Sequence, residues 1–550
     1  MVRAPAESTG FAGGTPARRP ARDVGDTIRT FTVAAAVGSA IALVVFMVLL
    51  ARTPSVPVFS AIPDAQARAL FHGHWNMPLN TLAIEAFDIH GRYYTYFGLW
   101  PSIVRMPVLL VTHHFDGHLT APSMVLALAV TLVSTARLHW ALRTIIRRDA
   151  PLGRAETASV GAIQFLVGAG SVVIFLGSRP LVYHEMEIWG IATGLLTADC
   201  LCRYAMRPST ARAVAVGAAA TIAAMSRPSV GFGAIAAVGL LALVEFVELM
   251  GWWRRHDGND EHDDTPAARG TWSRLVALAG TGVVLPGAVY AAINEARFGT
   301  LFSLPLDHQV FTFVDHQRKV TLAANGGSLF GFKFAPTTLL QYVRPDAIRF
   351  TSRYPFVDFP LHRAHVFGHV VFDTIDRSSS VTASMPGLLL LAIVGTVFLV
   401  RRRGLLARAV APAAIGLTAG TVFVITIAFV TNRYLADFVP PLVLLALVGV
   451  QAVASMRPVA ARSGRTGIAA IVVLCAFGAW ASFGLAVVYQ RNLQPNDPGY
   501  GRGTGAPAAA PARSPERSPA RRDLNVSAPH PAPTAARITI DGSAVARKRV

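Results

Sequence analysis

Long apolar segments alternate with shorter polar ones along most of the chain. Eleven apolar segments approach or reach the about 20 residues that a helix needs to cross the core of a bilayer. They cover residues 31–51, 120–142, 156–178, 187–204, 211–226, 229–250, 275–295, 385–400, 409–430, 437–456 and 467–489. The pattern therefore predicts an all-α polytopic membrane protein with about eleven transmembrane helices.

Two of the polar intervals are long, and they cover about residues 52–119 and 296–384. The remaining intervals are too short for a nucleotide-binding domain, which needs about 100 residues or more. Residues 1–28 and 492–550 are rich in Pro, Ala and Arg, a composition that cannot bury enough apolar surface to fold alone. We therefore expect a transmembrane domain over residues 29–491 between two disordered tails.

The arginines orient the predicted helices. Hydrophobic residues make up 53% of the chain and charged residues only 15%. The net charge of +19 comes mainly from arginines in short loops and in the tails, which is the distribution that orients a membrane protein rather than that of a nucleic-acid-binding surface. Each interval after an even-numbered helix is rich in arginine, as Arg143, Arg147, Arg148, Arg203, Arg254, Arg255, Arg401, Arg402, Arg403 and Arg462 show. The positive-inside rule then places the N-terminus in the cytoplasm, and both long intervals and the C-terminus outside. We therefore expect a multi-pass protein of the plasma or inner membrane.

The first long interval carries several carboxylates. Pro63 and Asp64 begin a predicted short helix, Glu85 and Asp88 follow, and the stretch from 91 to 98 contains Arg92, Tyr93 and Tyr94. Ionisable groups at a membrane face favour a functional interpretation. Asp64 could instead stabilise the dipole of its own helix.

The other outside turns carry paired acidic, basic and aromatic residues. Tyr183, His184 and Glu185 can donate, accept and relay protons, or they can cap a helix at the interface. An arginine outside defies the charge rule, so Arg227 is expected to face a phosphate or a carboxylate. Further along stand Arg297, Arg433, Tyr434 and Asp437, of which Arg433 and Asp437 are four residues apart and could pair on one helix face.

The chain resembles the GT-C superfamily of integral membrane glycosyltransferases, in particular the branch of protein mannosyltransferases and lipid A aminoarabinose transferases. The resemblance runs over about residues 30–490 and rests on the order and shared face of these short motifs. It implies that an acid of the first outside loop is the catalytic base, that the donor is a polyprenyl-phosphate sugar, and that arginines hold its phosphate. Asp64 is then the preferred base. Glu85 and Asp88 stay open, because the acidic pair of many relatives is absent beside Asp64.

The motifs yield a set of candidate residues. The candidate catalytic carboxylates are Asp64, Glu85, Asp88 and Glu185. The candidate substrate-binding residues are Arg92, Tyr93, Tyr94, Tyr183, His184, Arg227, Arg297, Arg433, Tyr434 and Asp437. No cofactor is expected. A divalent metal stays open because the side chains of His113, His114, Asp116 and His118 can bind one, although they lack a recognised ligand spacing.

Together these observations predict a membrane enzyme that moves a sugar from a polyprenyl-phosphate donor to an outside hydroxyl, with inversion. The donor class also follows from topology, because nucleotide sugars are cytoplasmic whereas the candidate residues face outward. The acceptor could be a lipid, a polysaccharide or a protein, and nucleic acid is not expected as a partner. The alternative is a transporter or flippase of lipid-linked envelope precursors, which would place ionisable residues near the bilayer midplane.

Overall fold

The computed structural model describes residues 21–53, 57–148, 150–256, 266–455 and 462–491. All of them lie in the first of two units, Met1–Gly503 and Thr504–Val550, into which contacts divide the chain. The predicted disordered tails lie mostly outside the described residues. Residues 21–28 are an exception, because α1 begins at Ala21 and no proline interrupts the helix after that point.

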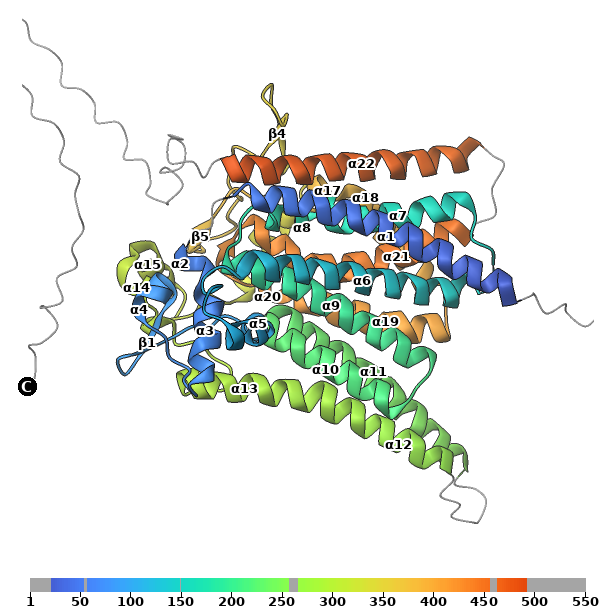
Figure 1. The fold of residues 1–550 in the computed structure, drawn as a ribbon, viewed down its shortest axis with the longest axis horizontal. Coiled ribbons are helices and arrows are strands. Elements are labelled where there is room, and N and C mark those ends of the chain that lie inside the picture. Colours follow the sequence, from blue (N-terminus) through green and yellow to red (C-terminus); the bar gives the residue numbers. More distant parts are fainter. Residues whose placement is uncertain (1–20, 54–56, 149, 257–265, 456–461, 492–550) are drawn as a thin grey trace, which may run out of the picture. The chain divides into compact units, whose positions relative to one another are not determined.

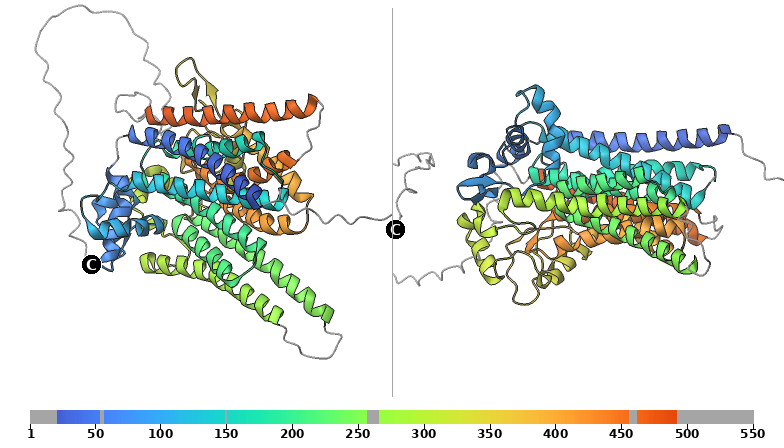
Figure 2. Two further views of the ribbon diagram at one scale, coloured as in Figure 1. Left: turned by 45° about the vertical axis from the view of Figure 1, so that its right-hand side comes forward. Right: turned by 90° about the horizontal axis from the view of Figure 1, so that it is seen from below.

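Long helices run side by side through this unit (Figures 1 and 2). Eight helical stretches of the described part are long and apolar enough to cross a membrane, which confirms the polytopic helical class. They are Gly25–Ala51, Thr120–Arg147, Arg154–Leu176, Pro228–Gly251, Gly270–Phe298, Leu405–Ile425, Asn432–Ser455 and Thr466–Arg491. The other three predicted spans coincide with α9 (Val182–Met206), which is long but polar in places, and with α10 (Thr210–Ser226) and α18 (Pro386–Val400), which are shorter.

Several spans are built from more than one helical element. Besides α9, α10 and α18, the helices of the bundle are α1 (Ala21–Ala51), α6 (Thr120–Arg147), α7 (Arg154–Ala169), α8 (Val172–Leu176), α11 (Pro228–His256), α12 (Pro266–Ala279), the π-helical turn η2 (Gly280–Val284), α13 (Leu285–Phe298), α19 (Leu405–Gly420), α20 (Val422–Ile425), α21 (Val439–Ser455) and α22 (Arg462–Arg491). The predicted span 409–430 ends early, because Phe429–Val430 leaves the helix and pairs as a parallel strand with Thr374–Ile375. Ser171 separates α7 from α8, and its hydroxyl accepts a hydrogen bond from the amide of Val173 at 3.2 Å.

Shorter elements gather at one end of the bundle, which we call the loop end (Figure 1). Those of the first long interval are α2 (Pro57–Ser60), α3 (Ile62–Phe71), α4 (Leu79–Leu82), η1 (Ala83–Glu85), β1 (Phe87–Ile89), β2 (Arg92–Tyr94) and α5 (Trp100–Val111). Those of the second are η3 (Leu306–His308), α14 (Val310–Val314), α15 (His316–Ala324), η4 (Phe332–Phe334), α16 (Ala335–Val343), β3 (Arg349–Phe350), β4 (Val357–Asp358), β5 (Thr374–Ile375) and α17 (Val381–Ser384). The strand β6 (Phe429–Val430) and the 3-10 helix η5 (Asn432–Phe438) precede α21 at the same end.

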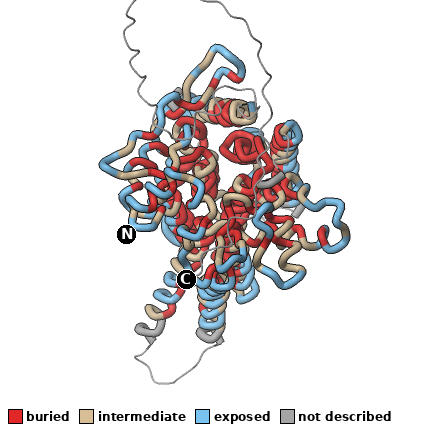
Figure 3. The backbone as a smooth tube through the Cα atoms, turned by 90° about the vertical axis from the view of Figure 1, so that its left-hand side faces the viewer, coloured by how far each residue is buried: buried red, intermediate tan, exposed pale blue. Residues whose placement is uncertain are grey.

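Helix α9 is the most deeply enclosed of the long helices. It packs against α6, α10, α11, α19 and α21, and its residues are buried along almost the whole length. Viewed from the loop end, buried residues fill the middle of the bundle and exposed ones border it (Figure 3). This central position explains why α9 carries ionisable residues: neighbouring helices supply partners that lipid could not.

Candidate active site

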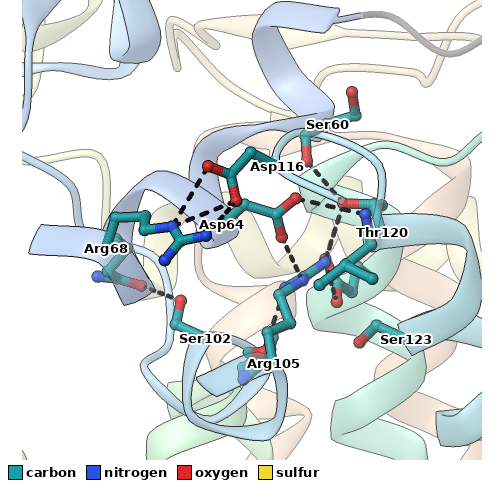
Figure 4. A network of polar contacts seen from close by, with 12 residues as sticks. Ser60, Asp64, Arg68, Ser102, Arg105, Asp116, Thr120 and Ser123 are labelled. Carbon is teal, nitrogen blue, oxygen red and sulfur yellow. Dashed lines mark hydrogen bonds and ion pairs between the residues drawn. The ribbon is translucent and has the colours of Figure 1, made fainter. Parts of the chain in front are cut away.

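An arginine joins two candidate carboxylates at the loop end (Figure 4). The Arg105 guanidinium on α5 lies 2.6 Å from the Asp64 carboxylate on α3 and 2.8 Å from the Glu185 carboxylate on α9. All three side chains are buried, with 2% or less of each exposed. Arg105 therefore supplies the positive charge that keeps two desolvated carboxylates together.

The neighbours of this ion-pair cluster fix its geometry. The hydroxyl of Thr120, the first residue of α6, accepts a hydrogen bond from Arg105 at 2.9 Å and donates one to the Ser60 carbonyl at 2.6 Å. The amide of Leu119 donates to Asp64 at 3.3 Å. Burial raises the pKa of the Asp64 carboxyl, and Arg105 opposes that rise. The predicted helix at Asp64 is present, but its carboxylate contacts Arg105 and the Leu119 amide, and its helix has no side-chain cap.

The first two turns of α9 divide the polar residues of the loop end into two groups. Tyr183 and Glu187 are four residues apart and share a face of the helix, whereas Glu185 points to a different side. Accordingly Glu185 contacts Arg105, Tyr183 contacts Glu85, and Glu187 lies 3.1 Å from the Arg227 guanidinium. The start of α9 thus brings together residues from four separate parts of the chain.

Glu85 lies at the centre of the second group. The Tyr183 hydroxyl donates a hydrogen bond to the Glu85 carboxylate, whose other oxygen accepts one from the Gln309 amide at 3.4 Å. Gln309 in turn accepts from Arg318 at 2.9 Å, and Arg318 lies 2.7 Å from Asp373. Burial raises the pKa of the Glu85 carboxyl, and the hydrogen bond from Tyr183 opposes that rise. Through this series of contacts, residues of the second long interval position the Glu85 carboxylate, which belongs to the first long interval.

Arg227 is fully engaged by carboxylates. It stands between α10 and α11 in an extended conformation, which the following Pro228 favours. Its guanidinium donates two hydrogen bonds to Asp437 at 3.0 and 2.6 Å, in addition to its contact with Glu187. The anionic partner expected for Arg227 is therefore a pair of carboxylates. The alternative in which Asp437 pairs with Arg433 does not occur, because Asp437 faces Arg227 and also accepts from Ser229.

Arg433 is placed differently. Its guanidinium carbon lies 4.7 Å from the ring centre of Tyr183 and 5.4 Å from that of Tyr434. Among the described residues no carboxylate forms an ion pair with it, although Glu85, Glu187 and Asp376 are close enough to attract it over a longer distance. Arg433 is thus a cation held by two aromatic faces, whose hydrogen-bond donors stay available to an anion.

The remaining candidates lie at structural positions. Asp88 accepts from the Gly91 amide in the turn between β1 and β2, Arg92 is exposed on that hairpin, and Tyr93 packs in a small apolar cluster. Two further candidates are buried against neighbouring chain segments. Tyr94 packs with Phe87 and Phe298, and His184 contacts the carbonyls of Leu176 and Arg179 at 3.0 and 3.2 Å.

Arg297, at the end of α13, is buried beneath the first long interval. It donates to the Phe97 carbonyl at 3.0 Å, and its guanidinium carbon lies 5.5 Å from the ring centre of Trp75. Its other donors have no hydrogen-bond partner among the described residues.

Five charged or amide residues of these clusters were not predicted from the sequence, namely Arg105, Glu187, Gln309, Arg318 and Asp373. Arg105 could have been predicted, because burying a single arginine within the apolar stretch 100–111 costs free energy unless a carboxylate pairs with it. Glu187 lies one helical turn after Tyr183 and could have been found in the same way. Gln309 and Arg318 carry no local indication, because their partners lie on distant segments. Within the described ranges, no group of three or more His, Cys, Asp or Glu residues is placed to hold a metal ion.

No protein-family model matches the sequence, and no curated protein matches it either. The solved structures to which the chain is similar include two membrane proteins. One is the oligosaccharyltransferase of Archaeoglobus fulgidus in the apo form, at 12% identity and a TM-score of 0.46, with 84% of this chain and 56% of that chain covered. The other is ArnT from Cupriavidus metallidurans bound to undecaprenyl phosphate, at 14% identity and a TM-score of 0.39, with 82% and 75% covered. The chain thus spans little more than half the length of the oligosaccharyltransferase, and at these TM-scores neither likeness bears on activity.

Proposed function

We propose that the protein is a membrane glycosyltransferase that moves a sugar from a polyprenyl-phosphate donor to a hydroxyl group outside the cytoplasm. The observation that carries this proposal is Arg433. Its guanidinium lies against two tyrosine rings and makes no ion pair within the described part of the chain, whereas the nearby Arg227 is neutralised by Asp437 and Glu187. An arginine that makes no direct ion pair, in such a place, suits the phosphate of a lipid-linked donor.

The location supports a lipid-linked donor rather than a nucleotide sugar. All the clusters lie at the loop end, and the distribution of arginines predicts that this end is outside the cytoplasm. A prenyl chain can lie along the helices while its phosphate reaches Arg433 at their ends. This geometry requires no soluble nucleotide-binding domain.

The proposed reaction is a single displacement. A carboxylate takes the proton of the acceptor hydroxyl, whose oxygen attacks the anomeric carbon as the bond to the phosphate oxygen breaks. Polyprenyl phosphate leaves with the electron pair of that bond, and the configuration at the anomeric carbon is inverted. Arg433 stabilises the charge that develops on the phosphate, which is the kind of electrostatic effect that contributes most to catalysis.

Two carboxylates can serve as the base, and they lie on different sides of α9. We assign the role to Glu85, because Tyr183 contacts both Glu85 and Arg433 and so links the base to the proposed phosphate site. Asp64, the choice from the sequence, is already paired with Arg105 and is the alternative. The raised pKa of either carboxyl would make it a stronger base than an exposed acid.

The test is mass spectrometry of envelope glycans and glycoproteins from a strain that lacks the gene, complemented with wild type or variants. We expect Arg433→Ala and Glu85→Gln to leave the product unglycosylated at wild-type protein levels. Matched controls at the opposite end of the bundle are Arg402→Ala and Glu248→Gln, which replace exposed side chains and should restore the product.

The outcomes separate the alternatives. Loss with Asp64→Asn but not with Glu85→Gln would move the base to Asp64. Full restoration by Arg433→Ala would overturn the phosphate site. If the protein were a transporter, the strain that lacks it would accumulate a lipid-linked precursor on the cytoplasmic side. Sugar transfer would then still proceed in that strain when the precursor is supplied outside. Purified protein that transfers no sugar from a polyprenyl-phosphate donor, under conditions where it is folded, would refute the enzyme.

A further inference from the structure

A short hairpin leaves the bundle beside the end of α22 (Figure 1). It consists of β3 (Arg349–Phe350) and β4 (Val357–Asp358), which pair in antiparallel register. An ion pair between Arg349 and Asp358 closes its base, and the amide of Thr351 donates to the Phe356 carbonyl at 3.1 Å. The hairpin is therefore an ordered element rather than a loose connection.

The hairpin follows the last turns of α22 closely. The Phe350 ring is stacked on that of Trp480, with centres 6.1 Å apart and an angle of 7° between the planes. At Gly484 a Cβ atom would lie 2.3 Å from Cγ1 of Val357, so this glycine permits the approach. At the helix end, the Arg491 guanidinium donates to the Tyr354 carbonyl at 2.6 Å.

Aromatic side chains of the hairpin are exposed. Phe350 is 69% exposed, Tyr354 53% and Phe356 52%. They stand next to exposed polar residues, Ser352 and Arg353, at the tip. Aromatic rings with polar groups nearby are enriched where a membrane meets water, because the ring enters the boundary and the polar groups stay hydrated.

The position along α22 agrees with that boundary. The candidate span Thr466–Arg491 has 26 residues and is about 39 Å long, which exceeds the hydrocarbon core of about 30 Å. Ile468, Val472 and Val473 are exposed on the half of the helix away from the loop end, as lipid-facing residues would be. The last three turns, from Trp480 to Arg491, against which the hairpin packs, thus extend from the outer part of the hydrocarbon into the headgroups.

We propose that the β3–β4 hairpin is an interfacial anchor, which inserts Phe350, Tyr354 and Phe356 into the headgroup–acyl boundary of the leaflet at the loop end. The partner is the phospholipid surface itself. The anchor would steady the middle of the second long interval against α22, and the proposal is independent of the enzymatic activity. Its aromatic surface continues the lipid-facing surface of α22, with which it makes direct contact.

The experiment uses the full-length protein with Cys200, Cys202 and Cys475 replaced by alanine. A single cysteine is introduced by Phe356→Cys, labelled with bimane, and reconstituted into phosphatidylcholine–phosphatidylglycerol vesicles. Acyl chains brominated near the headgroup quench a fluorophore at the boundary, and iodide quenches one in water. Two controls bracket the result: Val473→Cys on the lipid-facing side of α22, and Asp307→Cys, whose side chain is 81% exposed in the second long interval.

We expect the label at Phe356 to lose fluorescence with brominated lipid and to be protected from iodide, whereas the label at Asp307 shows the reverse. Equal iodide quenching at Phe356 and Asp307 would overturn the anchor. Protection from both quenchers would overturn it as well, since the hairpin would then be covered by protein, such as a second copy. Tyr354→Cys provides a second labelled position if the first variant does not elute as folded protein in gel filtration.

Discussion

Arg105 holds together two carboxylates that are almost completely withdrawn from solvent. Removal of the cation would leave Asp64 and Glu185 buried and unpaired. Such a loss costs about 3–5 kcal/mol, far more than the loss of an exposed ion pair. The cluster therefore affects stability chiefly because its disruption leaves two buried carboxylates without a cation.

We accordingly expect Arg105→Ala to destabilise the protein by about 3–5 kcal/mol, as measured by equilibrium unfolding in micelles. Arg68→Ala is the matched control, because Arg68 makes a partly exposed ion pair with Asp116 and donates to the carbonyls of Leu109 and Thr112, and its loss leaves no buried charge and should cost only about 1–2 kcal/mol. The neutral triple variant Asp64→Asn, Arg105→Met and Glu185→Gln should recover much of the stability. If Arg105→Ala were no less stable than Arg68→Ala, the ion-pair cluster would not be the stabilising unit described.

Glu85 leads to a prediction about pH. A base must be ionised, so the rate falls as the pH drops through its pKa, and burial raises the pKa of Glu85 above that of an exposed glutamate. The hydrogen bond from Tyr183 favours the ionised form. Tyr183→Phe should therefore raise that pKa further and move the acidic limb of kcat/KM to higher pH. An unchanged acidic limb in Tyr183→Phe would show that a different group titrates.

At the scale of elements, the close crossing of α18 and α21 depends on two glycines. A Cβ atom added at Gly395 would lie 1.9 Å from the Leu445 carbonyl oxygen, and one added at Gly449 would lie 2.0 Å from the Leu391 carbonyl oxygen. Small residues allow helix backbones in a membrane to approach each other in this way.

We expect Gly395→Ala or Gly449→Ala to force the two helices apart at a cost of about 1–3 kcal/mol. Gly287→Ala in α13 is the control, since nothing lies within 4 Å of its added Cβ and alanine favours the helix. Thermal unfolding of the three variants in the same detergent is the measurement. A midpoint for Gly395→Ala equal to that of Gly287→Ala would contradict the predicted clash.

At the scale of the whole molecule, orientation is the property that the charge distribution predicts and that labelling can test. Asp307 lies at the loop end, whereas Arg402 lies in the connection between α18 and α19 at the other end of the helices. In a cysteine-free background, Asp307→Cys in intact cells should react with a membrane-impermeant maleimide, and Arg402→Cys should react only after the membrane is opened. The reverse result would place the loop end in the cytoplasm and remove the argument for a lipid-linked donor.

The membrane class and the places of the spans could be read from the sequence because hydropathy is a local property: about 20 apolar residues require a bilayer or a core wherever they stand. The same holds for the helix at Asp64 and for the extended conformation of Arg227, which neighbouring prolines favour. Breaks within spans were less visible. The strand at Phe429–Val430, for example, forms because Thr374–Ile375 pairs with it from a distant segment.

The partners of the charged residues were decided by tertiary structure. Spacing along the chain left open whether Asp437 pairs with Arg433, and the packing of α9, α10 and α21 brings Arg227 to Asp437 and leaves Arg433 against two tyrosines. Arg105 likewise meets Asp64 and Glu185 only because α3, α5 and α9 converge. Hydropathy determines which segments enter the membrane, but the rotation and crossing of helices determine which side chains meet, and short motifs contain no record of either.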